Sequence, residues 1–583
     1  MQMKRIPSTF SDLKSYLESY TSPLLEEMRT EMSSSLEAIS TMPSTKISWI
    51  EQKKNNKVYD IVFDADSQNS KACNRPESYV PSVGDIIILS DVKPEHISDI
   101  TRNGRPYIVA FVTEGGDEDD DSPPVKYVII SSGKIDSEDG KCQDRKEIKL
   151  FAAYLLNIVT YIRIWRCLDY NTAVRRNQSL IQEMVHYPLV ADIVQKQKKD
   201  HSIDSMEIWS KLSTMDLNNS QNDAILNCIS SMHSNNSSSS FSLIWGPPGT
   251  GKTKTISVLL WLMREMDHGT LTCAPTNLAV KQVASRFLKV IKESSDRACL
   301  GDVLLCGNKQ RMCVDGNLKE IYLHDRVRTL LGCFVPMTGW RHRLSSLSDL
   351  FENGYSQYQK YLEDQKEELL EDFNKKFMNK NIEDEVKGIF LYNDDQSDSS
   401  LLVVDEAAQL KECEGLIPLR LPTLKHAILI GDECQLPATV KSKVCEDASF
   451  GRSLFERLSS LGHEKHLLNM QYRMHPSISI FPNISFYDRK LLDAPNVKQK
   501  EHRKKYLPGL MFGPYSFFNI EDGKEDLDEL GRSRKNVVEV QVPSRSGMKD
   551  ESPSTSTGIG GFPGDTEENV EDITVCLSNL KIR

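Results

Sequence analysis

The sequence predicts an α/β fold built on a doubly wound parallel sheet, and a repeated local pattern is the reason. Short strand-like runs are each followed by a polar or glycine-rich turn and then by apolar residues at helical spacing. The runs are Leu243–Trp245, Thr270–Cys273, Leu401–Val404 and Ala427–Ile430. Because buried strands alternating with helices are typical of parallel sheets, these segments define the central domain.

The chain of 583 residues is long enough for several domains. Short β-branched runs at Val83–Leu89, Tyr107–Val112 and Tyr127–Ile130 have no helical pattern between them, which indicates a small β-barrel. Residues with helical spacing flank this region on both sides. We therefore expect a helical segment at 1–45, a barrel at 46–150, a helical return at 151–215 and the α/β domain at 216–480, with a charged helical insertion at about 311–395.

The composition restricts the environment and the partners of the chain. Its net charge of −11 argues against bulk electrostatic binding of nucleic acid but leaves room for a local basic groove. No run approaches the ~18 apolar residues of a membrane-spanning helix, and the first residues lack the apolar core of a signal peptide. The 13 cysteines contain no C-x-x-C pair, so we interpret them as reduced thiols of an intracellular protein rather than a metal site.

A glycine-rich turn after the first strand carries the strongest motif. It has the pattern G-x-x-x-x-G-K-[ST] between a strand and a helix, a context that a chance match would not share. Backbone N–H groups of such a turn cradle phosphate oxygens at the positive end of the helix. Lysine reaches the outer phosphates and the hydroxyl residue ligates Mg²⁺. The residues are Gly246, Pro247, Pro248, Gly249, Thr250, Gly251, Lys252 and Thr253. The turn predicts binding of a nucleoside triphosphate with Mg²⁺.

Polar groups at the ends of later strands complete the expected site. Asp405 and Glu406 end a buried strand, where one acid holds Mg²⁺ and the other polarises the attacking water. Gln435 follows another strand and is placed to touch the γ-phosphate. Arg473 offers charge to the transition state and Tyr472 an aromatic face to a purine. Taken alone, an arginine there is more often a salt-bridge partner and a tyrosine more often a core residue.

Taken together, the motif segments resemble superfamily 1 helicases of the up-frameshift and senataxin type, and most of all the plant senataxin-like proteins. The similarity extends over roughly residues 215–545 and rests on five segments. They are GPPGTGKT at 246–253, APTNLAV at 274–280, DEAAQLKECEG at 405–415, GDECQLPATVKSK at 431–443 and LLNMQYRMHPSIS at 467–479. The resemblance implies a P-loop RecA-like lobe, an N-terminal helical stalk with an inserted β-barrel, and helicase activity that consumes ATP.

The resemblance also implies residue roles in ATP binding and hydrolysis. By this resemblance, Gln221 reads the adenine edge and Tyr472 stacks on the base. Lys252 and Thr253 hold phosphates and Mg²⁺, and Asp405 supports Mg²⁺. Glu406 orients water, and Gln435 and Arg473 sense the γ-phosphate. An AAA-type oligomeric ATPase would explain the phosphate loop, but it would leave the GDECQLP and QYRMHP segments unexplained.

A turn after the second strand offers two interpretations. By resemblance, Pro275, Thr276 and Asn277 lie near single-stranded nucleic acid and contact its backbone. By local chemistry alone, the segment is a strand-to-helix turn in which Thr276 caps the helix. The basic cluster Lys498–Lys505 could serve as a nuclear address or a phosphate contact, but such a cluster is more often a solvated surface loop.

The family's second RecA-like lobe is expected to be largely absent. Residues 481–540 resemble the beginning of that lobe, which in the family carries D-x-F-Q-G and T-R-A segments. We interpret residues 541–583 as a disordered or aberrant tail that lacks a T-R-A segment. Gly560–Gly564 echoes a D-x-F-Q-G segment only faintly, with Pro563 in place of glutamine.

Two functions are therefore expected as alternatives. The first is an ATP-dependent helicase or nucleic-acid-stimulated ATPase acting on RNA or RNA–DNA hybrids. The second is a truncated protein that binds ATP and nucleic acid without unwinding. The expected cofactors are ATP and Mg²⁺. The expected partners are single-stranded RNA or DNA and RNA-processing proteins, with the chain a monomer, located in the nucleus or otherwise in the cytoplasm and not on a membrane.

Overall fold

The structure is a computed structural model of the chain, and its description covers the following residues: 3–53, 57–63, 81–94, 96–100, 107–115, 126–133, 135, 150–170, 178–185, 205–233, 239–294, 300–307, 312–335, 338–347, 399–499, 502, 523–527 and 534–536. The chain divides into two compact units, Met1–Arg503 and Lys504–Arg583. Most of the charged insertion and all of 541–583 lie outside the described residues.

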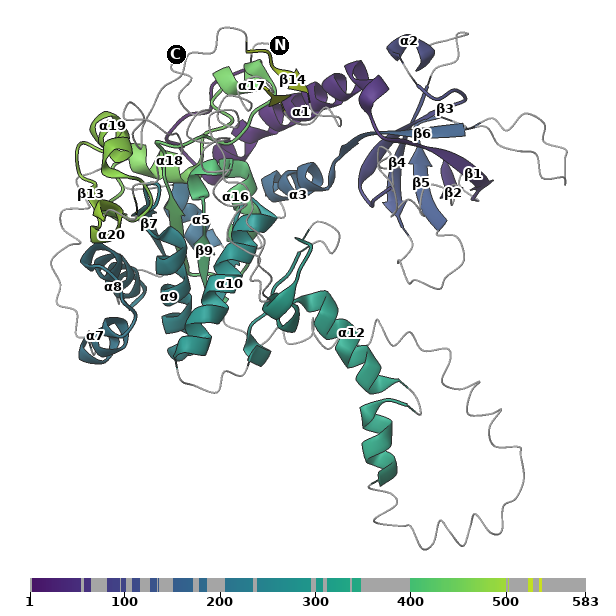
Figure 1. Cartoon of the computed structure of the whole chain (residues 1–583). Coiled ribbons are helices and arrows are strands. Elements are labelled where there is room, and N and C mark those ends of the chain that lie inside the picture. The colour runs from purple at the N-terminus through teal and green to yellow at the C-terminus, as the bar shows by residue number, and fades with distance from the viewer. Residues whose placement is uncertain are drawn as a thin grey trace, which may run out of the picture. The chain divides into compact units, whose positions relative to one another are not determined.

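Six antiparallel strands close into the small β-barrel that the sequence predicts (Figure 1). The strands are β1 (Ser44–Gln52), β2 (Val58–Phe63), β3 (Asp85–Ser90), β4 (Ile108–Glu114), β5 (Lys126–Ser131) and β6 (Leu150–Asn157), in the order β1-β2-β5-β4-β3-β6. Alternate residues of each strand fill the interior, for example Ile87 and Leu89 of β3 or Tyr127 and Ile129 of β5. This alternation is what a half-buried strand requires.

The prediction of helical spacing from residue 150 is wrong for its first segment, because Leu150–Asn157 forms β6. This strand closes the barrel by pairing with both β1 and β3. Ala152 points into the barrel core, whereas Ala153, Leu155 and Leu156 pack against the end of the first helix. A strand that is apolar on both faces lacks alternation, so its sequence is hard to distinguish from a buried helix.

Helices on both sides of the barrel segment pack together. The long helix α1 (Leu13–Glu37) begins at Asp12, whose side chain accepts a hydrogen bond of 2.8 Å from the Ser15 N–H. It packs against α3 (Val159–Leu168), α5 (Gln178–Val185) and α17 (Lys443–Asp447). Helix α1 therefore contacts segments that are far from it in sequence, and the assignment of these helices as a family stalk stays a prediction.

Five parallel strands form the central sheet, in the order β11-β7-β10-β9-β8. They are β7 (Ser240–Trp245), β8 (Gly269–Cys273), β9 (Ser399–Val404), β10 (His426–Gly431) and β11 (Lys465–Leu467). The four expected strands are confirmed, and β11 joins them at the edge. Because all five strands run in one direction, the motif segments that follow them meet at the carboxyl edge of the sheet.

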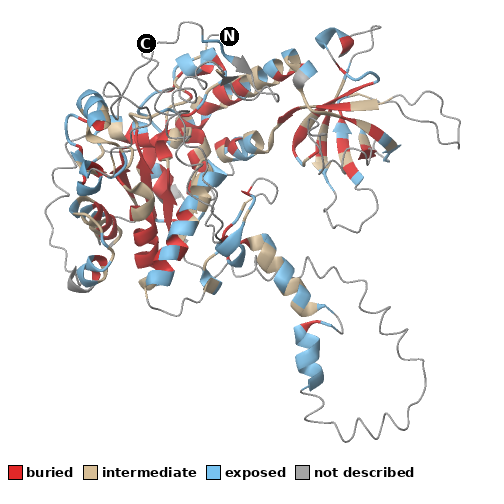
Figure 2. Ribbon diagram, in the orientation of Figure 1, coloured by how far each residue is buried: buried red, intermediate tan, exposed pale blue. Residues whose placement is uncertain are grey.

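Each strand divides its side chains between two hydrophobic cores. Leu243 and Leu402 belong to the core on one face of the sheet, and their neighbours Ile244 and Leu401 belong to the core on the other face. Helices α8 (Asn219–His233), α9 (Lys252–Glu265) and α10 (Asn277–Glu293) cover the second face, and the N-terminal helices with α16 (Glu412–Leu419) and α18 (Leu454–Ser460) cover the first. Figure 2 shows the sheet as a buried layer between them.

Shorter elements complete the described chain. They are α2 (Ile97–Ile100), α7 (Ser205–Ser213), α12 (Leu323–Phe334), α19 (Pro476–Phe486), α20 (Pro495–Lys498), η1 (Ile39–Thr41), η4 (Leu300–Asp302), η5 (Gly316–Glu320), η6 (Ala407–Gln409), β12 (Met470–Gln471) and β13 (Leu492–Asp493). In the second unit, β14 (Asp526–Leu527) pairs with β15 (Arg534–Lys535). Within the described ranges, no helix combines the length and the apolar character that crossing a bilayer demands.

Candidate nucleotide-binding site

The glycine-rich turn between β7 and α9 adopts a conformation that other residues would strain. Gly249 and Gly251 have φ angles of +74° and +83°, in the left-handed region. A Cβ on Gly249 would lie 2.5 Å from Cβ of Arg473, and one on Gly251 would lie 2.6 Å from Nε2 of Gln221. The two glycines therefore let the turn fit closely against segments from both ends of the domain.

The first turn of α9 supplies the groups that bind phosphate in such a loop. Its N-cap is Gly251, which has no side chain to cap the first N–H groups, so these donors remain suited to an anion. The buried Thr250 hydroxyl donates a 2.8 Å hydrogen bond to the Pro247 carbonyl and fixes the loop. Lys252 Nζ donates to the Gly246 carbonyl at 3.0 Å and lies 3.5 Å from Glu406 Oε1.

The acidic pair follows β9 directly. Asp405 is buried, with an exposed fraction of 4%, and its backbone N–H donates to the Cys273 carbonyl at 2.9 Å. Glu406 has a φ of +51°, so the chain turns there, and its carboxylate approaches Lys252. Burial and the neighbouring Glu406 charge raise the pKa of Asp405 to about 6, although Lys252 opposes the shift. A buried carboxylate beside a phosphate loop suits a hard cation.

Gln409 contacts the acidic pair, and sequence reasoning missed it. Its Nε2 donates a 3.3 Å hydrogen bond to Glu406 Oε2 across the short helix η6. The signal was present in the sequence, because Gln409 lies inside the DEAAQ segment. Gln409 therefore restricts the orientation of the Glu406 carboxylate at Oε2, whereas Lys252 lies near Oε1 of the same carboxylate.

The segment after β10 is organised around a buried aspartate. Gln435 Nε2 donates to Asp432 Oδ2 at 2.7 Å, and the Asp432 side chain is 2% exposed. Trp245 Nε1 donates to the other oxygen at 2.8 Å, which ties the residue before the phosphate loop to this segment. Tyr487 also donates to Asp432, and no local pattern in the sequence marked it.

The segment after β11 packs directly on the phosphate loop. The Tyr472 N–H donates to the Gly249 carbonyl at 2.8 Å, and Arg473 lies against Gly249. The Tyr472 hydroxyl accepts a 2.9 Å hydrogen bond from Asn218 Nδ2 while 37% of the residue stays exposed. Both expected residues of this segment thus lie beside the loop, and Asn218 is a further contact that sequence reasoning missed.

Gln221, the expected adenine-reading residue, lies beside the phosphate loop at the start of α8. It is 2% exposed, and its Nε2 donates to the Thr250 carbonyl at 3.2 Å. Its Oε1 accepts a 3.1 Å hydrogen bond from the Asn218 N–H. Both ends of the amide therefore already have protein partners, which fix the loop to α8.

Pro275, Thr276 and Asn277 follow β8 at the start of α10. Thr276 is the N-cap of this helix, and its Oγ1 accepts a 3.2 Å hydrogen bond from the Ala279 N–H. The capping interpretation is confirmed. Thr276 and Asn277 are exposed, and their contact with nucleic acid stays a prediction.

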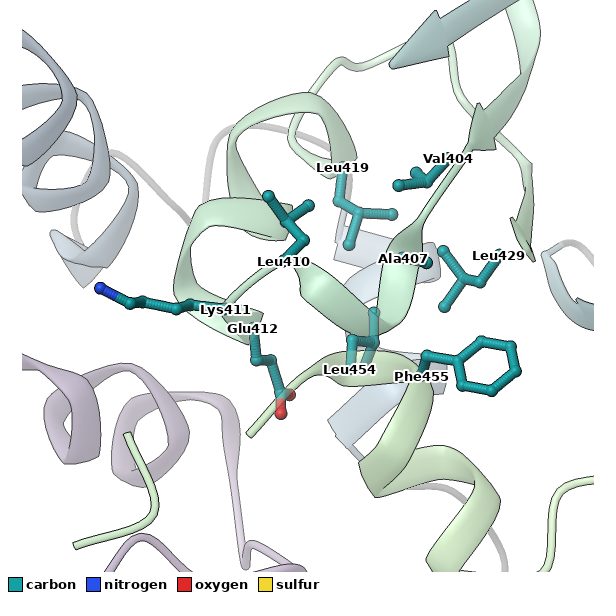
Figure 3. A pocket seen from close by; sticks show the side chains of 10 residues that line it. Val404, Ala407, Leu410, Lys411, Glu412, Leu419, Leu429, Leu454 and Phe455 are labelled. Carbon is teal, nitrogen blue, oxygen red and sulfur yellow. The ribbon is translucent and has the colours of Figure 1, made fainter. Parts of the chain in front are cut away.

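An internal cavity beneath the acidic loop is too small for a ligand. It measures about 10 Å³ and lies between mostly apolar side chains of the sheet, η6, α16 and α18, including Val404, Leu429 and Phe455 (Figure 3). That volume holds about one water molecule at most. Lys411 and Glu412 extend away from the apolar lining.

Comparisons with known proteins agree with the fold and the motifs. Residues 1–192 match a family described as a domain of unknown function (DUF6469). Residues 216–396 and 391–443 match one family described as an AAA domain, and residues 450–546 match a second family with that description.

Three curated relatives match parts of the chain. Helicase SEN1 of Saccharomyces cerevisiae is 26% identical over 452 residues, covering 64% of this chain and 20% of the relative. Probable helicase MAGATAMA 3 of Arabidopsis thaliana is 42% identical over 144 residues, 24% of this chain and 17% of the relative. A regulator of nonsense transcripts 1 homolog of Arabidopsis thaliana is 31% identical over 317 residues, covering 51% of this chain and 23% of the relative.

The chain thus matches about a fifth of the length of each of these relatives. The matches cover the sheet domain that carries the phosphate loop and the strand-end motifs. With the motif set and the geometry of the site, these similarities support a superfamily 1 helicase of the up-frameshift/senataxin type.

Proposed function

We propose that the chain is an ATP-dependent helicase or nucleic-acid-stimulated ATPase that acts on RNA or RNA–DNA hybrids. One observation carries the proposal, namely the convergence of distant motif segments on the phosphate loop. Lys252 lies 3.5 Å from Glu406, the Tyr472 N–H donates to Gly249, and Gln221 donates to Thr250. Segments that meet at the carboxyl edge of a parallel sheet form the place where such folds bind their ligands.

The residues of the site fit ATP and Mg²⁺. The uncapped first turn of α9 and Lys252 suit the phosphates, and Tyr472 offers an exposed aromatic face to the base. The Thr253 hydroxyl and the Asp405 carboxylate provide the oxygen ligands that Mg²⁺ prefers. When bound, Mg²⁺ neutralises charge on the phosphates.

The side chains around the expected position of the γ-phosphate account for hydrolysis. Glu406 holds the attacking water and accepts its proton, and Gln409 keeps the carboxylate oriented. Gln435 and Arg473 approach the γ-phosphate from the two segments that follow β10 and β11. Lys252 and Arg473 stabilise the charge that develops on the transferred group.

A single strand of nucleic acid would contact the exposed turn Pro275–Asn277 through its backbone. This turn follows β8, whose neighbour β9 leads into Asp405 and Glu406. Binding of a strand at the end of β8 is therefore linked through the sheet to the acidic pair. We expect a monomer in the nucleus that works beside RNA-processing proteins.

The first test is ATP hydrolysis by the purified chain, with and without poly(U) RNA or single-stranded DNA. We expect turnover that single strands stimulate and that Glu406→Gln abolishes. Glu293→Gln is the matched control, because Glu293 lies at the far end of α10 and its side chain is 66% exposed. Unchanged turnover in Glu406→Gln would contradict the proposal.

Unwinding is tested separately with a labelled RNA–DNA duplex that carries a single-stranded overhang. ATP-dependent strand release supports the helicase function. Hydrolysis without strand release supports an ATPase only. Binding of ATP and single strands without turnover supports the alternative, a protein that binds both ligands and does not unwind.

A further inference from the structure

Asp432 receives hydrogen bonds from three separate parts of the chain. Its Oδ1 accepts from Trp245 Nε1 at 2.8 Å and from the Cys434 N–H at 3.2 Å. Its Oδ2 accepts from Gln435 Nε2 and from the Tyr487 hydroxyl, both at 2.7 Å. Because a carboxylate has about four acceptor positions, these donors occupy its capacity.

Gln435 and Tyr487 share one oxygen, which makes the two side chains interdependent. Asp432 is 2% exposed, so water has little access to replace a lost donor. Burial and the Asp432 charge raise the pKa of Tyr487 far above its usual range, so its hydroxyl remains a donor. Removal of this donor leaves Asp432 Oδ2 under-satisfied and frees the carboxylate to rotate away from Gln435.

Tyr487 also connects two motif segments. It follows α19 directly, and that helix begins immediately after the segment that contains Tyr472 and Arg473. Its ring packs at 5.8 Å from the ring of Trp245, and the neighbouring Phe486 carbonyl accepts a hydrogen bond of 3.5 Å from Cys434 Sγ. The end of α19 is thus fixed to the segment that carries Gln435.

We propose that Tyr487 is a positioning residue for recognition of the γ-phosphate, which acts through Asp432 on Gln435. The inference rests on the proposed function, since it assigns Gln435 to the γ-phosphate. Tyr487 itself is 2% exposed, so its role is to orient other side chains and not to contact the nucleotide. Its hydroxyl sets the orientation of Asp432, Asp432 sets that of the Gln435 amide, and the amide separates ATP from ADP.

The test compares the affinities of the full chain for ADP and for a non-hydrolysable β,γ-imido analogue of ATP, each with a fluorescent label. Tyr487→Phe keeps the ring and removes only the hydroxyl. We expect weaker binding of the ATP analogue by roughly three- to tenfold, with the affinity for ADP unchanged. A purely structural role would weaken both ligands together, and that result would overturn the proposal.

A double-mutant cycle identifies the route. Gln435→Ala should weaken binding of the ATP analogue, and Tyr487→Phe should add nothing in that background, because neighbours in one network are not additive. Additive effects would overturn the proposal. Tyr59→Phe is the matched control, since its hydroxyl accepts a 3.1 Å hydrogen bond from the Ile135 N–H in the barrel region, and it should change neither affinity.

If Tyr487→Phe does not fold, Asp432→Asn takes its place. This variant should lower affinity for the ATP analogue and leave that for ADP unchanged, and equal losses would contradict the relay. The binding assay needs no turnover, so the two levels of inference fail separately. A wild-type chain that binds neither nucleotide overturns both, whereas unchanged discrimination in Tyr487→Phe overturns only the relay.

Discussion

Two pairs of opposite charge in the same domain differ in how completely the protein surrounds them. Arg457 and Glu412 lie 2.8 Å apart, and neither side chain is exposed to solvent. Lys252 and Glu406 lie 3.5 Å apart, with 12% and 26% of their side chains exposed. The first pair is suited to stabilising the fold, and the second to a site where a ligand can replace contacts within the protein.

The Arg457–Glu412 pair joins distant segments. The Tyr16 hydroxyl of α1 donates to Glu412 Oε1 at 2.9 Å, and Arg457 donates to the carbonyls of Ser8 and Met184 at 3.3 and 3.2 Å. The Glu412 charge raises the pKa of Arg457 despite the opposing effect of burial. The region of unknown function is therefore fixed to the sheet domain by a satisfied network of charges.

A second buried carboxylate, Glu27 of α1, binds the later residues of two motif segments. Glu27 is 2% exposed and accepts from the N–H groups of Lys441 and Ser442 at 2.7 and 3.0 Å. Lys411 Nζ lies 3.4 Å from the same carboxylate. Lys411 follows the acidic pair and Lys441 follows Gln435, so α1 supports both.

Lys252→Ala should give the largest effect, on activity alone. We expect ATP hydrolysis to fall by a factor on the order of 10² or more, because a charge beside the transferred phosphate is lost. The free energy of unfolding should change by less than about 1 kcal/mol, since this pair is partly exposed. Turnover assays and denaturant unfolding measure the two quantities.

The control is Lys289→Ala, a lysine whose side chain is 70% exposed on α10. It should change neither quantity. A large loss of stability in Lys252→Ala would show that the two charge pairs do not differ in the way proposed.

Arg457→Met should give the largest effect on stability. Removing one member leaves Glu412 buried without its counter-charge, so we expect the free energy of unfolding to fall by about 3–5 kcal/mol. Urea denaturation measures it. Lys490→Met is the matched control, because its pair with Asp488 is more than half exposed and should contribute about 0–1 kcal/mol. Equal effects of the two variants would refute the comparison.

Glu27→Gln should have an intermediate effect. The amide keeps one acceptor oxygen and turns a donor toward a backbone N–H, so we expect a loss of about 1–3 kcal/mol in unfolding free energy. Glu18→Gln tests the same change on the exposed side of α1, where the side chain is 65% exposed. A stability of Glu27→Gln indistinguishable from that of Glu18→Gln would contradict the assigned role.

Thr276→Ala should give the smallest effect. Loss of the N-cap of α10 should cost about 1 kcal/mol of stability, whereas Thr276→Ser keeps the capping oxygen and should cost little. Measured affinities of both variants for single-stranded RNA then separate capping from nucleic-acid contact. Weaker binding in Thr276→Ser at unchanged stability would indicate that the threonine contacts the strand itself.

The parallel sheet and the residues at its carboxyl edge could be predicted from the sequence. Local chemistry was sufficient there, because glycines before a lysine at a helix start, combined with acids after an apolar strand, have few other structural uses. The strands that end at Trp245, Val404 and Gly431 follow the same rule. The barrel strands could be predicted where apolar and polar residues alternate, but β6 could not, because both of its faces are covered.

The way in which distant residues support that edge depends on tertiary packing. Tyr487 reaches Asp432, and Tyr16 reaches Glu412, across long stretches of sequence. A buried hydrogen bond of this kind depends on which groups the folded chain excludes from water, and no local periodicity encodes that exclusion. The sequence therefore identified the groups suited to a nucleotide, and tertiary packing determined the partners that orient them.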